Sequence, residues 1–405
     1  MTSSFTWLDY SEHDRRKMVD VISAFREQDT RDELGIGTIR DGFADILFPG
    51  TSTIQTRARY FLFVPWIYLD LELKKIEGSK AAEWARGRET GLINALAKSG
   101  DRKGVIGIDA RDKLKRLPSN IYWRGLHVWG IRQFAGSQDQ YHRSLDRYYI
   151  TKGQMLRSDD KDVVSGFCDP NWHSGIPARP DGFPWEASFE LRQVDAEYLR
   201  TRITEGRNAS SSLLAHLVRQ KSAPSSQPFV WESEFYGGFP ADIRICIDHA
   251  RLFSESIHGA ALLYNLMLAE QSNQDETVAS YKEQIDGWAE MIKARRSALT
   301  SWDQDAFWDL LDKSEARVPK RTRQFVSQWL RRALSMTDAR QIADDSELRD
   351  LIHNRERMLK RGQARLDNPR ALELWSGAAG TGRLDFRWGV SRTILTDIVE
   401  GLSNA

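Results

Sequence analysis

Hydrophobic residues recur along most of the chain at the spacing of an amphipathic helix. Met18, Val21, Ile22 and Phe25 follow one another at intervals of three and four residues, behind a Ser11–Asp14 stretch that is typical of a helix N-cap. The same spacing predicts helices over residues 80–99, 190–203, 244–270, 277–299, 303–312, 320–335, 344–361 and 390–402. Alternation typical of strands is confined to residues 229–231 and 384–388. We therefore expect a mainly α, multi-helical fold with little β structure.

Two stretches interrupt the helical pattern and suggest how the chain is divided. Residues 165–185 carry four prolines and several glycines, and residues 222–228 are a polar linker rich in Ser and Pro. We predict an N-terminal helical unit over 1–160, a joining region over 161–228, and an Arg-rich helical unit over 229–405. The aromatic residues that should keep the long irregular loop ordered are Phe167, Trp172, Phe183 and Trp185. A loop of this length is often functional, so it is a candidate lid or contact surface.

A helix-turn-helix outline lies between residues 36 and 68. A Phe-Pro-Gly break at 48–50 separates a short helix from one expected to open at Thr53. A DNA-reading helix places base- and phosphate-binding side chains in its first turns. The polar side chains at those positions are Gln55, Arg57 and Arg59. A weaker second outline joins a basic segment at 110–117 to an aromatic one at 121–131. The alternative for both is an ordinary helical hairpin with internal ion pairs.

The 405-residue chain has a formal net charge of +1, so its overall charge does not indicate a nucleic-acid partner. Only local stretches of the sequence are basic. Arg outnumbers Lys by 42 to 16, a bias that suits phosphate contact but also follows from a GC-rich genome. Residues 101–160 hold 12 Lys and Arg against 7 Asp and Glu, and residues 313–370 hold 15 against 8. The alternative is a set of solvated helix faces with i,i+4 ion pairs. The side chains expected to contact phosphate in the second stretch are Lys320, Arg321, Arg323, Arg331 and Arg332.

The predicted helix over 244–270 carries the best candidates for chemistry. Arg251 and His258 match the loose Arg-x6-His pattern of helical ribonuclease domains, where they would handle phosphate charge and proton transfer. Glu255 and His258 lie three apart and could face one metal, but a di-metal bundle site needs a second Glu-x-x-His motif. Core residues bonded to their neighbours are the plainer interpretation. We therefore expect no catalysis, although the pattern leaves an enzyme open.

Other motifs narrow the function further. Gly377–Arg383 lacks the Lys and Ser/Thr of a P-loop, which leaves a helix-ending turn or a backbone anion site. Cys168 and Cys246 complete no four-ligand zinc set, so we expect no metal and no cofactor. The apolar run 60–69 is far shorter than the about 20 residues of a membrane-spanning helix. With no secretory signal in view, we expect a cytoplasmic protein that makes no membrane contact.

Several strings along the chain resemble an uncharacterised bacterial family of unknown function. They lie at residues 5–11, 30–37, 48–53, 258–265, 375–377 and 384–388. The resemblance spans most of the chain and brings no established activity, cofactor or site residue with it. It implies an accessory subunit encoded beside helicase-type genes in anti-phage defence clusters.

These observations favour a non-catalytic, DNA-associated accessory or adaptor protein that works with a helicase- or nuclease-type partner. On that hypothesis, replacing Arg57 and Arg59 by Ala should weaken duplex binding and leave the melting temperature nearly unchanged. One alternative is a helical nuclease that uses Arg251 and His258, for which His258→Ala should abolish cleavage. The other is a scaffold that binds only proteins.

Overall fold

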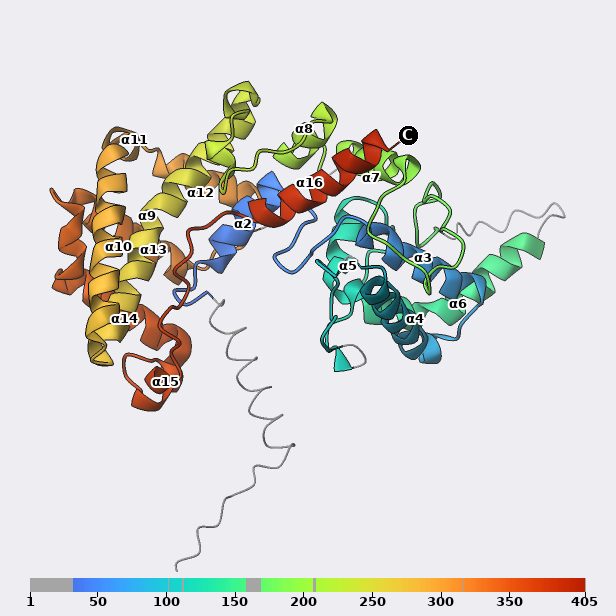
Figure 1. Ribbon diagram of the computed structural model, residues 1–405, viewed down its shortest axis with the longest axis horizontal. Coiled ribbons are helices and arrows are strands. Elements are labelled where there is room, and N and C mark those ends of the chain that lie inside the picture. Colours follow the sequence, from blue (N-terminus) through green and yellow to red (C-terminus); the bar gives the residue numbers. More distant parts are fainter. Residues whose placement is uncertain are drawn as a thin grey trace, which may run out of the picture. The chain divides into compact units, whose positions relative to one another are not determined.

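The computed structural model consists of helices joined by turns and irregular segments (Figure 1). It describes residues 32–100, 102–110, 113–157, 169–206, 209–314 and 316–404. Within these ranges there is no β-strand, and β pairing is limited to an isolated antiparallel bridge between Arg132 and Trp172. The mainly α class predicted from the hydrophobic spacing is confirmed.

The chain divides into two compact units, each assembled from separated stretches of sequence. Unit 1 combines Met1–Gly42 with Asp248–Leu384, and unit 2 combines Phe43–Ile247 with Asp385–Ala405. The division falls within two helices, α2 (Gly37–Leu47) and α9 (Ala241–Gln271). Residues 160 and 228, where the sequence suggests boundaries, both lie inside the longer stretch of unit 2.

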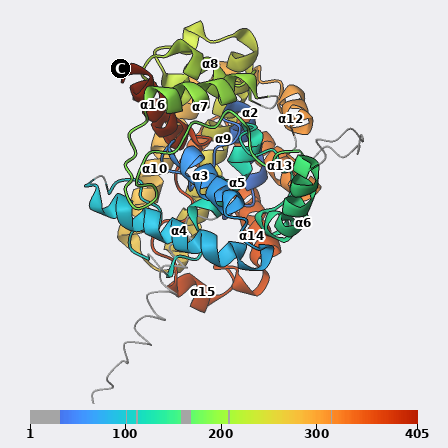
Figure 2. The ribbon, with the colours of Figure 1, turned by 90° about the vertical axis from the view of Figure 1, so that its right-hand side faces the viewer.

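Unit 2 is built around α3 (Tyr60–Leu73), a helix whose first eight residues are all buried. A helix that is apolar on every side must be covered on every side; α4 and α5 both pack against α3, and α4 also packs against α6. Figure 2 shows these four helices gathered together. The further helices of unit 2 are α4 (Gly78–Lys98), α5 (Pro118–Val128), α6 (Gln138–Arg157), α7 (Gln193–Glu205), α8 (Leu213–Gln220) and α16 (Trp388–Ser403), with 3-10 turns at Val230–Glu232 and Tyr236–Gly238.

Unit 1 is organised by the packing of α9 against α10 (Asp275–Ala294). Gly259 permits this approach, because a Cβ there would lie 2.5 Å from the ring of Trp288. The indole Nε1 of Trp288 donates to the carbonyl oxygen of Glu255 at 2.8 Å, which fixes the two helices side by side. The further helices of unit 1 are α11 (Arg296–Thr300), α12 (Gln304–Lys313), α13 (Lys320–Ser335), α14 (Ser346–Lys360) and α15 (Pro369–Glu373), with 3-10 turns at Ala339–Ala343 and Arg361–Gln363.

Most predicted helices coincide with observed ones to within a few residues, and α13 matches at both ends. The two predicted strands are wrong. Residues 230–232 form a 3-10 turn, while Phe386 and Arg387 have φ angles of 51° and 69°, which a strand cannot accommodate. The helix predicted from Met18 to Phe25 lies outside the described residues.

The helix expected to open at Thr53 begins instead at Tyr60. Residues 51–59 are turns and irregular chain, because their N–H groups are bonded to distant side chains. The hydroxyl oxygen of Tyr122 accepts the N–H groups of Thr56 and Arg57 at 2.9 and 3.2 Å, and Asp397 accepts that of Ala58 at 2.7 Å. The second outline also lacks its first helix in the part that is described, since 111 and 112 lie outside it and α5 starts at Pro118.

The Pro-rich segment is irregular, as predicted, over the part that begins at residue 169. Trp172 and Phe183 are buried; Trp172 Nε1 donates to the Tyr141 hydroxyl at 3.2 Å, and Phe183 stacks on Phe63 of α3. Trp185, expected to be buried, is 59% exposed. Phe167 lies outside the described residues. The described part of the loop is therefore a piece of the unit 2 core rather than a separate flap.

Candidate nucleic-acid interface

Seven of the 15 cations of the basic stretch 313–370 are neutralised by ion pairs between described residues of unit 1. The ion pairs are Arg323–Asp312, Arg332–Asp345, Arg340–Glu290, Arg349–Glu270, Arg357–Asp367, Lys360–Glu33 and Arg365–Glu33. Several of these carboxylates come from outside the stretch. Fewer of its cations are therefore free to bind an anion than its formal excess of positive charge suggests. Of the five cations predicted to contact phosphate, Lys320, Arg321 and Arg331 form no ion pair among the described residues, whereas Arg323 and Arg332 do. All three lie on α13 and are exposed.

Helix α13 is strongly two-sided. Its buried face consists of Thr322, Phe325, Val326, Trp329, Leu330 and Ala333. Trp329 anchors the helix by donating its Nε1 hydrogen to the carbonyl oxygen of Ser256 at 3.0 Å. The opposite face carries Arg321, Gln324, Gln328 and Arg331, at intervals of three, four and three residues. Because this spacing keeps side chains on one side of a helix, the four form a continuous polar stripe, which we call the α13 stripe.

The α13 stripe borders a groove between α13 and α14. One hollow of about 250 Å³ is lined by Arg321, Gln324 and Gln328 of α13 together with Asn354 and Met358 of α14. A second, of about 460 Å³, continues along α13 to Arg331, Arg332 and Ser335. Gln328 and Leu351 belong to both hollows, so they form one groove. Guanidinium and amide groups along such a groove are the donors that bind phosphate oxygens and the base edges of guanine and adenine.

The start of α13 is electrostatically unbalanced. Its first turn carries Lys320, Arg321 and Arg323 and no acidic residue, and Pro319 supplies no side-chain cap. The positive end of the helix dipole already lies there, so cations at these positions are unfavourable and an anion is favourable. Arg323 is compensated by Asp312 and stacks over Trp308, with its guanidinium 5.0 Å from the ring centroid. Lys320 and Arg321 have no such compensation among the described residues.

The two remaining arginines predicted for this surface are less available. Arg332 pairs with Asp345 at 2.6 Å and with Glu347 at 3.5 Å. Asp345 also caps α14, since its Oδ1 accepts the N–H of Leu348 at 2.9 Å. Arg323 is held by Asp312. Of the five cations predicted here, the structure therefore leaves Lys320, Arg321 and Arg331 open to a ligand and ties up the other two.

In unit 2, the other predicted contact residues are bonded internally. Gln55 is buried; its Nε2 donates to the carbonyl oxygen of Gly50 and its Oε1 accepts the N–H of Ser52, both at 3.2 Å. Arg57 Nε lies 3.0 and 3.1 Å from the two carboxylate oxygens of Asp397, and its guanidinium stacks on Phe189. These side chains hold the 50–58 loop in place.

Arg59 is more buried than Arg57, with 5% of its surface exposed, and it too is bonded within unit 2. Its Nη1 donates to the carbonyl oxygens of Ser188 and Glu190, and its Nη2 lies 3.6 Å from Asp195. Burial lowers the pKa of Arg59, and the neighbouring Asp195 opposes that effect. Arg59 therefore joins the loop at 188–190 to the start of α3, which is a structural role.

A second groove, of about 750 Å³, lies in unit 2 along one side of α16. Gln55 and Arg57 line it, together with Lys103 and Arg392. Its cations are offset by Asp397 and Glu400, and Arg392 donates to the carbonyl oxygens of Ser226 and Gln227 at 2.6 and 3.1 Å. The bonded guanidinium groups and the two carboxylates make this groove a weaker phosphate site than the groove beside the α13 stripe, which is lined by one carboxylate, Glu347.

A buried carboxyl group in unit 2 has an altered acidity. Glu89 of α4 is completely buried and accepts both the N–H and the hydroxyl hydrogen of Ser119, at 2.8 and 2.7 Å. Burial raises its pKa from 4.5 to about 7, because the bonds from Ser119 only partly offset the cost of burying a charge. Gln138 extends the network by donating to the Ser119 hydroxyl at 2.9 Å.

The candidate nuclease residues on α9 do not meet at an open site. Arg251 Nε donates to Glu255 at 2.9 Å, and Arg295 approaches the same carboxylate at 3.3 Å. His258 Nε2 donates to the carbonyl oxygen of Thr381 at 3.0 Å. Burial lowers the pKa of His258, so it is a neutral donor near pH 7. Glu255 thus pairs with two arginines rather than with His258.

Groups of acidic, His and Cys side chains suited to a metal do not occur in the described part of the chain. Cys246 is partly buried, and burial raises the pKa of its thiol to about 11, which leaves it a poor nucleophile. Cys168 lies outside the described residues.

Several residues of the groove were not anticipated from the sequence, and three of them carry amide groups. Gln324, Gln328 and Asn354 line it beside the predicted arginines. The first two could have been found, because they follow Arg321 at helical spacing on a helix that the hydrophobic pattern locates well. Asn354 depends on α14 packing beside α13, and no local pattern reveals that contact.

Comparison with known proteins places the chain in a family without giving it an activity. The model of a family of unknown function, DUF6361, matches residues 2–401. No curated protein and no solved structure matches the chain. Among the described residues, no helix combines the length and apolar character needed to cross a membrane.

Proposed function

The chain belongs to DUF6361, a family of unknown function, and we propose that it is a non-catalytic, DNA-associated accessory protein. It contacts the phosphate backbone through the α13 stripe and Lys320. Arg321 and Arg331 bind phosphate oxygens at the two ends of the stripe, and Gln324 and Gln328 lie between them. Within this proposal Gln55, Arg57 and Arg59 support unit 2 rather than touch DNA.

A single observation carries this proposal: Arg321 and Arg331, which form no ion pair among the described residues, lie on one face of one helix, α13, along a groove. A solvated helix face explains scattered cations equally well. A solvated face does not explain why the first turn of α13 carries cations and no acidic residue. The helix dipole disfavours a cluster of cations at that end. A bound phosphate removes that imbalance.

The arrangement of α9 supports an accessory role rather than a catalytic one. A nuclease needs its Arg and His free to reach phosphate and the attacking or leaving oxygen. Arg251 and His258 are engaged by Glu255 and by the Thr381 carbonyl oxygen, respectively. Accordingly, the chemistry belongs to a partner of the helicase or nuclease type. The proposal places that complex in the cytoplasm, in anti-phage defence.

The test is a fluorescence anisotropy titration of the full chain with labelled double- and single-stranded DNA at two salt concentrations. Counterion release predicts a steep loss of affinity between about 50 and 200 mM salt, of roughly tenfold or more for three phosphate contacts. Arg321→Ala/Arg331→Ala should weaken binding and make it less dependent on salt. It should leave the circular dichroism spectrum unchanged, because neither side chain is buried.

A matched control comes from the same unit. Lys282→Ala/Lys293→Ala removes the same net charge from the exposed surface of α10 and should leave the affinity nearly intact. Equal weakening by both double variants would reduce the effect to overall charge and contradict the proposed surface. An absence of binding at low salt would refute DNA association of the chain on its own.

A further inference from the structure

A cavity of about 370 Å³ lies in unit 1 against the glycine-rich segment Gly377–Leu384. Its remaining walls come from the chain just before α2, from the first turns of α2, and from Ala261 and Tyr264 of α9. A few hundred cubic ångströms is the size of a small-molecule site. The proposed DNA contacts make no use of it.

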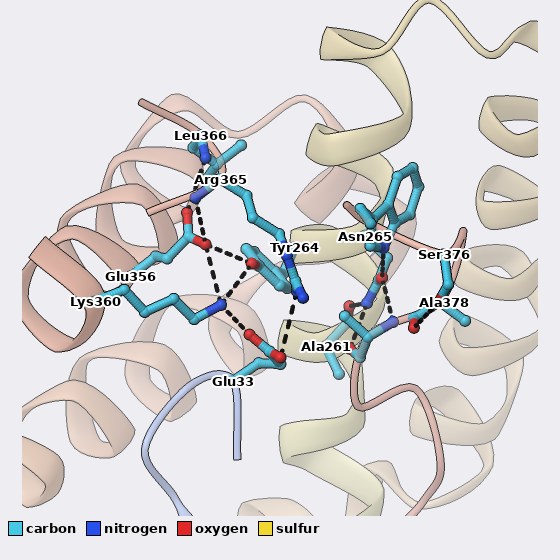
Figure 3. A network of polar contacts seen from close by, with 12 residues as sticks. Glu33, Ala261, Tyr264, Asn265, Glu356, Lys360, Arg365, Leu366, Ser376 and Ala378 are labelled. Atoms are coloured by element: carbon cyan, nitrogen blue, oxygen red, sulfur yellow. Dashed lines mark hydrogen bonds and ion pairs between the residues drawn. The ribbon is translucent and has the colours of Figure 1, made fainter. Parts of the chain in front are cut away.

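Side chains of the two central helices hold the glycine-rich segment by its carbonyl oxygens. The bonds run from Ser254 to Leu384 at 2.9 Å, from His258 to Thr381 at 3.0 Å, and from Tyr281 to Gly377 at 2.6 Å. Asn265, fully buried, binds both the carbonyl oxygen and the N–H of Ala379 at 2.8 Å (Figure 3). Buried polar groups are stabilising only when bonded, so these four side chains turn a flexible sequence into a fixed wall.

The same segment keeps backbone donors unused. The N–H groups of Gly380, Thr381 and Gly382 have no acceptor among the described residues. Gly380 and Gly382 have no side chains, so what they present to the cavity is backbone. Gly380 has a φ of +63°, a conformation that favours glycine. Consecutive free N–H groups at a cavity wall are a recurring way of binding anionic oxygens.

The two carboxylates facing the cavity are already bonded. Asp32 accepts the N–H groups of Ile36 and Gly37 at the start of α2. Glu33 pairs with Lys360 and Arg365 in the network drawn in Figure 3, where Tyr264 and Glu356 complete the cluster. Glu33 is therefore compensated by two cations, whereas Asp32 keeps its charge and has both oxygens directed to the N–H groups at the start of α2.

Arg40, by contrast, has a weakly held guanidinium at the same cavity. Its ion pair is with the adjacent Asp41 at 3.2 Å, and the side chains of Arg40 and Asp41 are 30% and 44% exposed. Exposed pairs of this kind contribute little to stability and are readily exchanged for a stronger acceptor. Phosphate offers two oxygens in the planar arrangement that guanidinium prefers.

The rest of the cavity wall is mostly apolar, formed by Leu34, Ile36, Ala261, Ala378, Ala379 and Leu384 together with Tyr264. The three alanines and the glycine backbone leave room for a flat ring. We propose that this cavity binds a mononucleotide. Its phosphate is taken by Arg40 and the N–H groups of Gly380–Gly382, and its base lies against Ala261 and Ala379.

The experiment is isothermal titration calorimetry of the full chain with adenosine and guanosine 5′-monophosphates, the two nucleosides, and inorganic phosphate. One nucleotide should bind at least about tenfold tighter than its nucleoside and than phosphate, a difference of about 1.4 kcal/mol. Ala261→Leu fills the cavity and should abolish that binding. Arg40→Ala should weaken it by about tenfold or more. Arg317→Ala, which removes an exposed cation of the same unit outside the cavity, should have no effect.

Three outcomes would overturn the proposal. These are no heat from either nucleotide at about 1 mM, phosphate alone binding as tightly as the nucleotides, and unchanged affinity in Arg40→Ala. Thermal melting of Ala261→Leu shows whether that variant folds; if it does not, Arg40→Ala decides the question. DNA binding is measured separately, so a negative result here leaves the α13 stripe untouched.

Discussion

The two regions in which the sequence suggests phosphate contact use arginine in opposite ways. In unit 2, Arg59 is buried and gives its donors to the carbonyl oxygens of Ser188 and Glu190, and Arg57 gives its own to Asp397. In unit 1, Arg321 and Arg331 are exposed on α13 with no ion-pair partner in the described chain. A guanidinium that already donates to protein acceptors can bind phosphate only by breaking those hydrogen bonds, which lowers the stability of the fold. Whether its donors are available, rather than the residue type, separates a structural arginine from a binding one.

The largest effect expected from this comparison is on folding. Arg59→Ala should lower the free energy of unfolding by about 3 kcal/mol, because it leaves the carbonyl oxygens of Ser188 and Glu190 without this donor and leaves Asp195 with Arg192 as its remaining cation. Urea denaturation followed by circular dichroism measures the change. A variant as stable as wild type would show that Arg59 is not structural, and would restore it as a candidate DNA contact.

The buried carboxyl group of Glu89 gives unit 2 a pH dependence. The pKa of Glu89 is about 7 in the folded protein against an ordinary 4.5, so stability is fully present below pH 4.5 and is lost as pH rises through 7. Glu89→Gln cannot ionise; its Oε1 still accepts the Ser119 N–H, and its Nε2 can donate to the Ser119 hydroxyl oxygen, so it should remove up to roughly 3 kcal/mol of that loss. Denaturation at pH 5 and pH 8 tests this; an unchanged difference between the two pH values would contradict it.

A smaller loss of stability is expected for Arg57→Ala. Asp397 stays buried, keeps its bond from the Ala58 N–H and loses the guanidinium, so the free energy of unfolding should fall by about 2 kcal/mol. Burial already raises the pKa of Asp397, and protonation relieves the unpaired charge. The loss should therefore be larger at pH 8 than at pH 5. A melting temperature equal to that of wild type at both pH values would contradict this role.

The smallest effects belong to the paired arginines of α13. Arg323→Ala and Arg332→Ala each break an ion pair at the surface, and such pairs contribute little to stability. The melting temperatures of both variants should be close to that of wild type. The melting temperature of Arg321→Ala should also be close to it. A marked drop for Arg323→Ala alone would mean that its stacking on Trp308 supports α12 and α13 more than an exposed contact usually does.

The helices were largely predictable because the spacing of hydrophobic residues that marks each helix lies within the helix's own sequence. Helix α13 buries residues at intervals of three and four, and the pattern alone locates both of its ends. The 51–59 segment has comparable spacing and capping residues, yet it is not helical. Its N–H groups bond to Tyr122 and Asp397, which lie about 65 and 340 positions away in the chain. Tertiary hydrogen bonds of this kind override local preference and leave no signal in the sequence.

The site was predictable only in part, for a related reason. The basic stretch 313–370 was recognisable from charge, but its pairing was not, because Asp312, Glu270 and Glu290 are supplied by other segments. The glycine-rich segment 377–383 was likewise visible as a motif. The cavity beside it depends on bonds from α9 and α10, which the sequence does not reveal.

The most direct test compares the salt dependence of duplex DNA binding by three proteins: wild type, Arg321→Ala/Arg331→Ala and Arg323→Ala/Arg332→Ala. All carry α13, and the two variants have the same net charge. Loss of the unpaired arginines should reduce the slope of log affinity against log salt by about 2, one for each phosphate contact. Loss of the paired arginines should change that slope by less than about 1. Equal reductions in the two variants would contradict the account.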